Sequence, residues 1–118
     1  MITEQSDVLT KALGEVRERF LYDLDQRICD FEHLKGLIET GSDRTDAIRA
    51  VAMVAHKIRG VAPTLGLARM GALAGSLEDL LANPAGHSTP SAAWREAAPV
   101  LETLLDEMER VQPDYSTG

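Results

Sequence analysis

The chain has 118 residues, of which 44% are hydrophobic and only 4% aromatic, and it carries a formal net charge of −7. A chain of this length is expected to form one domain over residues 1–118, with a single core. The acidic balance disfavours binding to nucleic acid, whose phosphates attract basic faces. The longest apolar run, Ala50–Ala55, is far shorter than the roughly 20 residues that a membrane span needs.

The N-terminal residues and the single cysteine indicate a cytoplasmic protein. The start MITEQSD has neither the basic nor the apolar region of a secretory leader, and Cys29 has no second cysteine with which to form an internal disulfide. We expect a monomer that is not associated with a membrane.

Apolar residues spaced three and four apart, the pattern of one helix face, predict four long helices. Gly41 is the expected stop of the first helix, while Thr89 as N-cap and Pro90 at the first position start the last one. The predicted helices run from Glu15 to Thr40, from Arg44 through an apolar stripe that ends at Leu65, from Leu67 to Ala82, and from Thr89 to Val111.

Short connections between successive helices favour an all-α fold, an antiparallel up-down-up-down four-helix bundle. The bundle is expected to occupy about residues 15–111. Residues 1–14, with Val8, Leu9 and Leu13, predict a short additional helix over one end, and residues 112–118 a frayed tail. Trp94 and Phe31 are expected in the core.

A histidine and a glycine lie one turn apart in the helix that begins at Arg44. His56 follows the core position Ala55, about 100° round the helix, and is therefore expected at the edge of the apolar stripe. Arg59 and Gly60 share its face, whereas Lys57 points to a flank. Glycine inside a helix costs roughly 1 kcal/mol relative to alanine, so Gly60 indicates a requirement other than folding.

The segment around His56 is positive within an acidic protein. Residues 47–77 contain Arg49, Lys57, Arg59 and Arg69 but no aspartate or glutamate. An anion or an acidic partner would be favoured there.

These residue types suit phosphoryl transfer. A neutral imidazole can accept a phosphoryl group on one nitrogen while a hydrogen bond holds the other. Arg59 is placed to neutralise charge on the phosphoryl oxygens, and Gly60 leaves space for an acceptor carboxylate to approach in line.

Three stretches of the sequence resemble the histidine-containing phosphotransfer (HPt) domain of multistep phosphorelays and the first domain of chemotaxis kinases. They are the pentad His56-Lys57-Ile58-Arg59-Gly60, its continuation Val61-Ala62-Pro63-Thr64-Leu65-Gly66, and Leu73-Ala74-Gly75-Ser76-Leu77-Glu78.

The resemblance implies that His56 is the phosphorylated residue and that Arg59 replaces the family's usual lysine. In chemotaxis-kinase relatives a glutamate of the next helix hydrogen-bonds the second imidazole nitrogen, and an ungapped alignment puts Glu78 at that position. Lys57 replaces the small hydroxyl residue common after the histidine. Pro63 also departs from the pattern, and it predicts a kink because its ring clashes with the carbonyl of Arg59.

The sequence contains no GxGxxG or GxxxxGK loop for ATP, so we expect a phosphocarrier without kinase activity of its own. The expected partners are receiver domains of response regulators and of a hybrid sensor histidine kinase. No cofactor is expected, because any Mg²⁺ would belong to the receiver's acidic pocket. The predicted partner surface includes Ala52, Gly60, Val61 and Thr64.

A competing hypothesis is a non-catalytic helical adaptor that binds a receiver or a kinase without carrying phosphate. His33 and His87 lack the spacing of metal ligands and are interpreted as structural or surface residues. Gly71-x-x-x-Gly75 is interpreted as a site of close helix packing.

Overall fold

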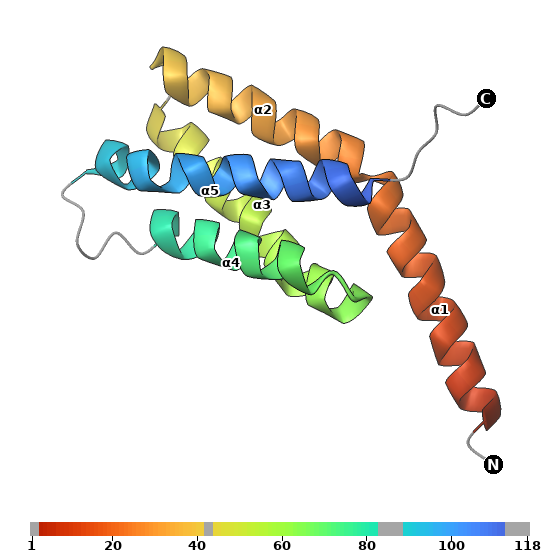
Figure 1. Cartoon of the computed structure of the whole chain (residues 1–118). Coiled ribbons are helices and arrows are strands. Elements are labelled where there is room, and N and C mark those ends of the chain that lie inside the picture. The colour runs from red at the N-terminus through yellow and green to blue at the C-terminus, as the bar shows by residue number, and fades with distance from the viewer. Residues whose placement is uncertain (1–2, 42–43, 83–88, 113–118) are drawn as a thin grey trace, which may run out of the picture.

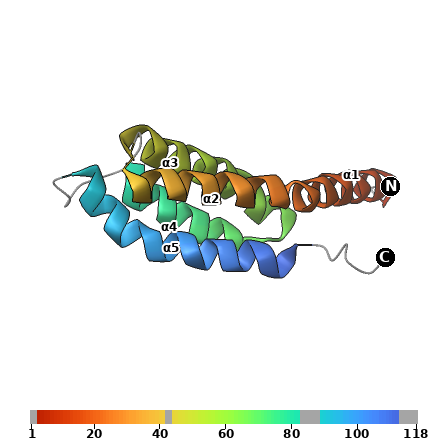
Figure 2. The same ribbon diagram turned by 90° about the horizontal axis from the view of Figure 1, so that it is seen from above.

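The computed structural model describes residues 3–41, 44–82 and 89–112, and its secondary structure there is helical throughout. Helices α2 to α5 run alternately in opposite directions and form a four-helix bundle (Figure 1, Figure 2). The predicted all-α antiparallel bundle is therefore confirmed. The elements are α1 (Thr3–Tyr22), α2 (Leu24–Thr40), α3 (Arg44–Val61), the 3-10 helix η1 (Ala62–Leu65), α4 (Ala68–Ala82) and α5 (Pro90–Val111).

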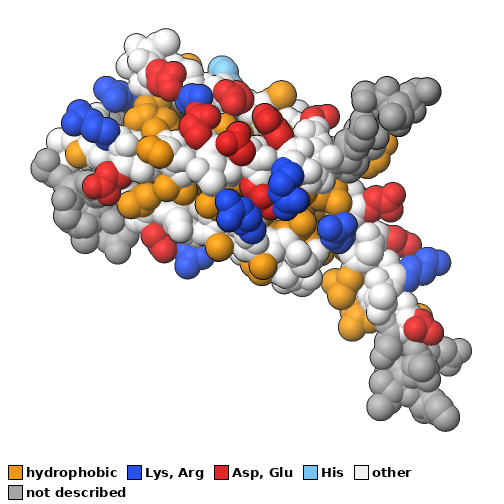
Figure 3. Space-filling model, viewed as in Figure 1, with side chains coloured by type: hydrophobic (Ala, Val, Ile, Leu, Met, Phe, Trp, Pro, Cys, Tyr) orange, Lys and Arg blue, Asp and Glu red, His pale blue; other side chains and the backbone are white. Residues whose placement is uncertain are grey.

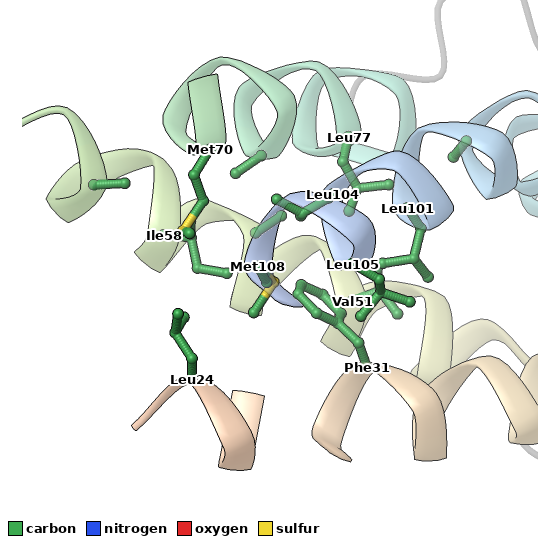
Figure 4. Close-up of a cluster of buried hydrophobic side chains, with 14 of the residues drawn as sticks. Leu24, Phe31, Val51, Ile58, Met70, Leu77, Leu101, Leu104, Leu105 and Met108 are labelled. Atoms are coloured by element: carbon green, nitrogen blue, oxygen red, sulfur yellow. The ribbon is translucent and has the colours of Figure 1, made fainter. Parts of the chain in front are cut away.

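The core of the bundle is built mainly from aliphatic and methionine side chains that project inward from all four helices (Figure 4). Each helix supplies residues three or four positions apart, which is why the apolar spacing predicted α2 to α5. Phe31 is fully buried and Trp94 is 6% exposed, as predicted. The largest fully buried side chains are Phe31, Leu24, Ile38, Ile58, Met70, Leu77, Leu101, Leu104, Met108 and Val51.

Two glycines of α4 let the preceding segment approach this helix closely. A Cβ added to Gly71 would lie 2.6 Å from Cγ of Pro63, and one added to Gly75 would lie 3.2 Å from Nε of Arg59. A real Cβ does not occupy positions that close to other heavy atoms without displacing them. The predicted packing role is confirmed for Gly71, which lies against the ring of Pro63 in η1, whereas Gly75 makes room for the side chain of Arg59.

The predicted kink at Pro63 is a change of helix type. Helix α3 ends at Val61, and Ala62–Leu65 continue as one turn of 3-10 helix. Proline has no N–H and its ring clashes with the carbonyl four residues back, which disfavours continuation of the α-helix at this position. The apolar stripe nevertheless continues, because Ala62 and Leu65 are both buried, and Gly66 ends η1 with a φ of 80°.

The predicted helix from Glu15 to Thr40 is wrong, because the chain bends at Asp23 between α1 and α2. Backbone hydrogen bonds span the bend: the amide of Asp23 donates to Arg19 O at 3.0 Å, and the amide of Arg27 to Asp23 O at 3.2 Å. The guanidinium of Arg27 lies 5.1 Å from the ring centre of Phe20 across the same bend. Leu24 is the first α2 residue that is buried in the core.

The additional N-terminal helix is present, but it has 20 residues instead of being short. It leaves the bundle at an angle (Figure 1), and hydrophobic side chains are exposed along it (Figure 3). Val8 is 68% exposed and Leu9 61%, so these side chains do not cover the end of the bundle as predicted. Contacts with that end are made by Phe20, which is buried in the core, and by Arg17, whose Nε donates to Leu65 O at 3.0 Å.

Helix α5 begins as predicted, because the hydroxyl of Thr89 accepts a hydrogen bond from the amide of Ala92 at 3.1 Å. At the other end Gln112 caps the helix, and its side-chain amide donates to Asp25 of α2. His87 and the rest of the predicted tail, residues 113–118, lie outside the described residues. None of the helices in the described part of the chain is both long and apolar enough to cross a membrane.

Candidate functional site

His56 lies on the outer side of α3, between two residues that anchor this helix in the core. Ala55 and Ile58 are completely buried, whereas the side chain of His56 is 72% exposed. The imidazole is therefore held by a helix that cannot rotate without exposing core residues, and it stays accessible to another molecule.

The exposed imidazole makes a hydrogen bond to the neighbouring helix. Its Nδ1 lies 2.6 Å from Oε2 of Glu78 on α4. Glu78 follows the fully buried Leu77, and its own side chain is only 17% exposed. The structure thus brings together the histidine and the glutamate that the sequence singled out.

This hydrogen bond decides which imidazole nitrogen is free. A carboxylate has only acceptor atoms, so Nδ1 of His56 carries the proton that is donated to Glu78. In the neutral ring the lone pair is then on Nε2. The nitrogen that can act as a nucleophile is the one that Glu78 does not contact.

Arg59 extends from α3 to α4 and contacts two carboxylates. Its Nη1 donates to Oε1 of Glu78 at 3.1 Å and to Oδ1 of Asp79 at 3.0 Å. The pKa of Arg59 is raised above its ordinary value, first by the hydrogen bond to Glu78 and then by that to Asp79. Both of these hydrogen bonds use Nη1, so neither of them occupies Nη2 of the guanidinium.

Glu78 therefore has a different partner on each oxygen. Oε2 accepts from His56 and Oε1 accepts from Arg59. The orientation of the carboxylate is set from both sides, and the orientation of the imidazole follows from it.

Gly60 and Lys57, the remaining residues of the predicted site, are exposed on α3. A Cβ added to Gly60 would meet no atom within 4 Å. Nothing in the described part of the molecule thus requires glycine at this position, in contrast to Gly71 and Gly75. Lys57 places a positive charge beside the histidine.

A hollow of about 330 Å³ lies between α3 and α4 next to His56. Ile48, Ala52 and Leu81 contribute apolar surface, Glu78 lies on the side of the histidine, and Met53 is 59% exposed. Of the predicted partner residues, Ala52 lines this hollow and is half-buried. Val61 is 39% exposed and Thr64 is also exposed, and both follow the site at the end of α3.

Sequence reasoning missed the site roles of three residues: Asp79, Met53 and Gly75. The missed role of Gly75 is to leave space for the side chain of Arg59. Met53 could have been found, because it is an apolar residue three positions before His56 and hence on the same helix face. Asp79 had no such signal, since its contact with Arg59 depends on how α3 crosses α4. Gly75 was predicted only as a packing residue.

The other described histidine, His33, is exposed on α2. Within the described residues, no group of three histidine, cysteine, aspartate or glutamate side chains is arranged to hold a metal ion.

Comparison with known proteins gives one match. No curated protein sequence and no solved structure matches the chain. The sequence model of the Hpt domain family, however, matches residues 11–112, a range that includes all four helices of the bundle and every residue of the site. The chain therefore belongs to the Hpt domain family.

Proposed function

We propose that the protein is a phosphocarrier that accepts a phosphoryl group on His56 from a receiver-domain aspartate and passes it to the aspartate of another receiver. Membership of the Hpt family implies phosphotransfer in two-component signalling in general. The observation that supports the specific role most strongly is the exposed imidazole of His56, whose Nδ1 is engaged by Glu78.

The chemistry that follows is a direct displacement at phosphorus. The lone pair of Nε2 attacks the aspartyl phosphate, the N–P bond forms as the P–O bond breaks, and the carboxylate of the partner leaves with the electron pair. The proton on Nδ1 of His56 remains hydrogen-bonded to Glu78, so the positive charge of the phosphorylated ring is balanced by the carboxylate. The return step reverses these bonds on the second receiver.

Arg59 supplies positive charge beside the reacting nitrogen. Because its two hydrogen bonds to Glu78 and Asp79 both use Nη1, the Nη2 group is left to donate to a phosphoryl oxygen. The hydrogen bond to Glu78 need not break for this second role.

The surface around His56 suits docking of a receiver domain. Gly60 provides clearance, because no side chain stands between the imidazole and an approaching carboxylate. Met53 and the hollow at Ala52 offer apolar contact on one side, and Val61 on the other. Lys57 would face the acidic receiver pocket, to which any Mg²⁺ would belong.

The phosphoryl donor is expected to be a partner protein, because the sequence contains no ATP-binding glycine loop. A hybrid sensor histidine kinase is the expected source through its receiver domain. We expect no kinase activity from the chain alone.

The test is transfer from a receiver that carries radiolabelled aspartyl phosphate. We expect acid-labile, alkali-stable label on the protein and its complete loss in His56→Gln. His33→Gln is the matched control, because His33 is also exposed but lies on α2, and this variant should label like the parent. A stable complex with the receiver but no label on His56 would instead support the alternative, a helical adaptor.

A further inference from the structure

Asp79 is the acidic residue of the site to which neither the sequence nor the family resemblance assigns a role. It lies on α4 directly after Glu78, and its Oδ1 accepts a hydrogen bond from Arg59 at 3.0 Å. The same Nη1 atom of Arg59 donates to Glu78. Asp79 is thus connected to His56 through two intermediate side chains.

Stability does not explain this contact. The side chain of Asp79 is 67% exposed and that of Arg59 is 48% exposed. Ion pairs exposed to this degree contribute little to folding, because solvent screens them and their side chains lose freedom. The contact therefore needs to be considered for its effect on position.

Arg59 needs more than one contact to stay in place. A long arginine side chain loses much of its rotamer freedom when it is fixed, which opposes a single position. On α4 the side chain passes over Gly75, where a Cβ would approach its Nε to 3.2 Å, and it ends between the carboxylates of Glu78 and Asp79. The absence of a side chain at Gly75 leaves room for Arg59 there, and the second carboxylate restricts where the guanidinium can go.

The position of Arg59 in turn affects Glu78. The Oε1 atom of Glu78 accepts from Arg59 while Oε2 accepts from His56. If Arg59 moves away, Glu78 loses the partner on one oxygen and is free to rotate, so the hydrogen bond to Nδ1 is held less firmly.

We infer that Asp79 is a positioning residue, which keeps Arg59 against Glu78 and so keeps Nδ1 of His56 protonated and Nε2 free. Only the expected consequence of this positioning, a faster transfer of the phosphoryl group, rests on the proposed function. The arrangement of the imidazole can be measured without any phosphoryl transfer.

The first experiment is ¹⁵N NMR of the imidazole in the unphosphorylated full chain. The parent should show the form with the proton on Nδ1, and Asp79→Asn should show an increased fraction with the proton on Nε2. Asp79→Glu keeps a carboxylate and should restore most of the parent spectrum. Asp106→Asn is the control, because it removes the same charge from an exposed position on α5 and should leave the spectrum unchanged.

The second experiment measures transfer from a phosphorylated receiver. Asp79→Asn should lower the rate at saturating receiver by less than the roughly tenfold loss expected when a side chain that contacts a functional histidine directly is changed. In an Arg59→Ala background the same change should have no further effect, because Asp79 acts through Arg59.

Three outcomes would overturn the inference. An unchanged imidazole spectrum in Asp79→Asn would show that Asp79 does not position His56. An equal loss of rate with and without Arg59 would show that Asp79 acts on its own. A change confined to the receiver concentration at half-saturation would assign Asp79 to docking. A protein that takes no label at all, yet shows the expected spectra, would contradict the proposed function and leave the positioning role intact.

Discussion

Two glutamates of this bundle are held by arginines from a neighbouring helix or turn, but they differ in what else they contact. Both oxygens of Glu107 on α5 accept from Arg110, at 2.9 and 2.7 Å, and Oε1 also lies 3.4 Å from Nε of Arg69 on α4. Glu78 shares only Oε1 with an arginine and gives Oε2 to His56.

The difference separates a structural carboxylate from a functional one. The side chain of Glu107 is 7% exposed, and both its oxygens contact positively charged side chains of the protein itself. Glu78 is 17% exposed and holds a side chain that is itself 72% exposed. A half-buried acid that orients an exposed base is an arrangement suited to chemistry with a second molecule.

The largest effect on stability is expected from Glu107→Gln. The change leaves Arg110 and Arg69 without their charged acceptor at a nearly buried position, and hydrogen bonds to charged groups contribute about 2 kcal/mol. Urea unfolding should show a loss of this size. Glu109→Gln, at an exposed position on α5, is the control, and an equal loss in both variants would contradict the structural role of Glu107.

Glu78→Gln should impair phosphoryl transfer and have little effect on stability. The amide can still contact the imidazole, but it no longer provides the charge that holds the Nδ1 proton, so we expect transfer to slow by about tenfold. Unfolding by urea should change less than in Glu107→Gln, since the side chain of Glu78 is 17% exposed against 7% for Glu107 and solvent screens its ion pairs more. Loss of stability without loss of transfer would remove the distinction between the two glutamates.

Low pH should weaken the ion pairs of Glu107 with Arg110 and Arg69. The hydrogen bond from Arg110 lowers the pKa of Glu107 below its ordinary value of 4.5. A carboxyl group with a lowered folded-state pKa stabilises the fold above its unfolded-state pKa, and the contribution is lost as the pH falls through the lower folded-state pKa. Unfolding free energy measured against pH should therefore fall below about pH 4.5, and less steeply in Glu107→Gln.

A gain in stability, and not a loss, is expected at Gly60, next to Arg59. Gly60→Ala should raise the free energy of unfolding by about 0.5–1 kcal/mol, because alanine is the better helix former and its Cβ meets open space. Gly60→Leu should slow transfer by obstructing the partner. Gly36→Leu is the matched control, since Gly36 is also helical and open but lies on α2; an equal effect of both leucines would contradict the clearance role.

The sequence was sufficient for the bundle because its core is periodic. Residues such as Leu101, Leu104 and Met108 follow the spacing of one helix face and are buried as that spacing predicts. The same periodicity misled at the N-terminus, since it reports which residues share a face and not what covers that face. Leu13 and Val16 continue the pattern but are 40% and 51% exposed on α1.

The bend at Asp23 could not be predicted for a related reason. No glycine or proline marks it, and helical hydrogen bonds continue on both sides. In the site, residues of one helix were placed correctly relative to each other, as with His56 and Arg59. The partner of Arg59 across the interface, Asp79, depends on the contact of α3 and α4 at Gly75, which spacing within a helix does not encode.

The hydrogen bond between His56 and Glu78 also has a practical consequence for detection. Phosphohistidine exists as two regioisomers, and with Nδ1 occupied by Glu78 the phosphorylated protein would carry the group on Nε2 alone. An antibody specific for the Nε2 isomer would detect the phosphorylated chain, whereas an antibody specific for the Nδ1 isomer would not. The choice of antibody is thus set by a single carboxylate oxygen on the adjacent helix.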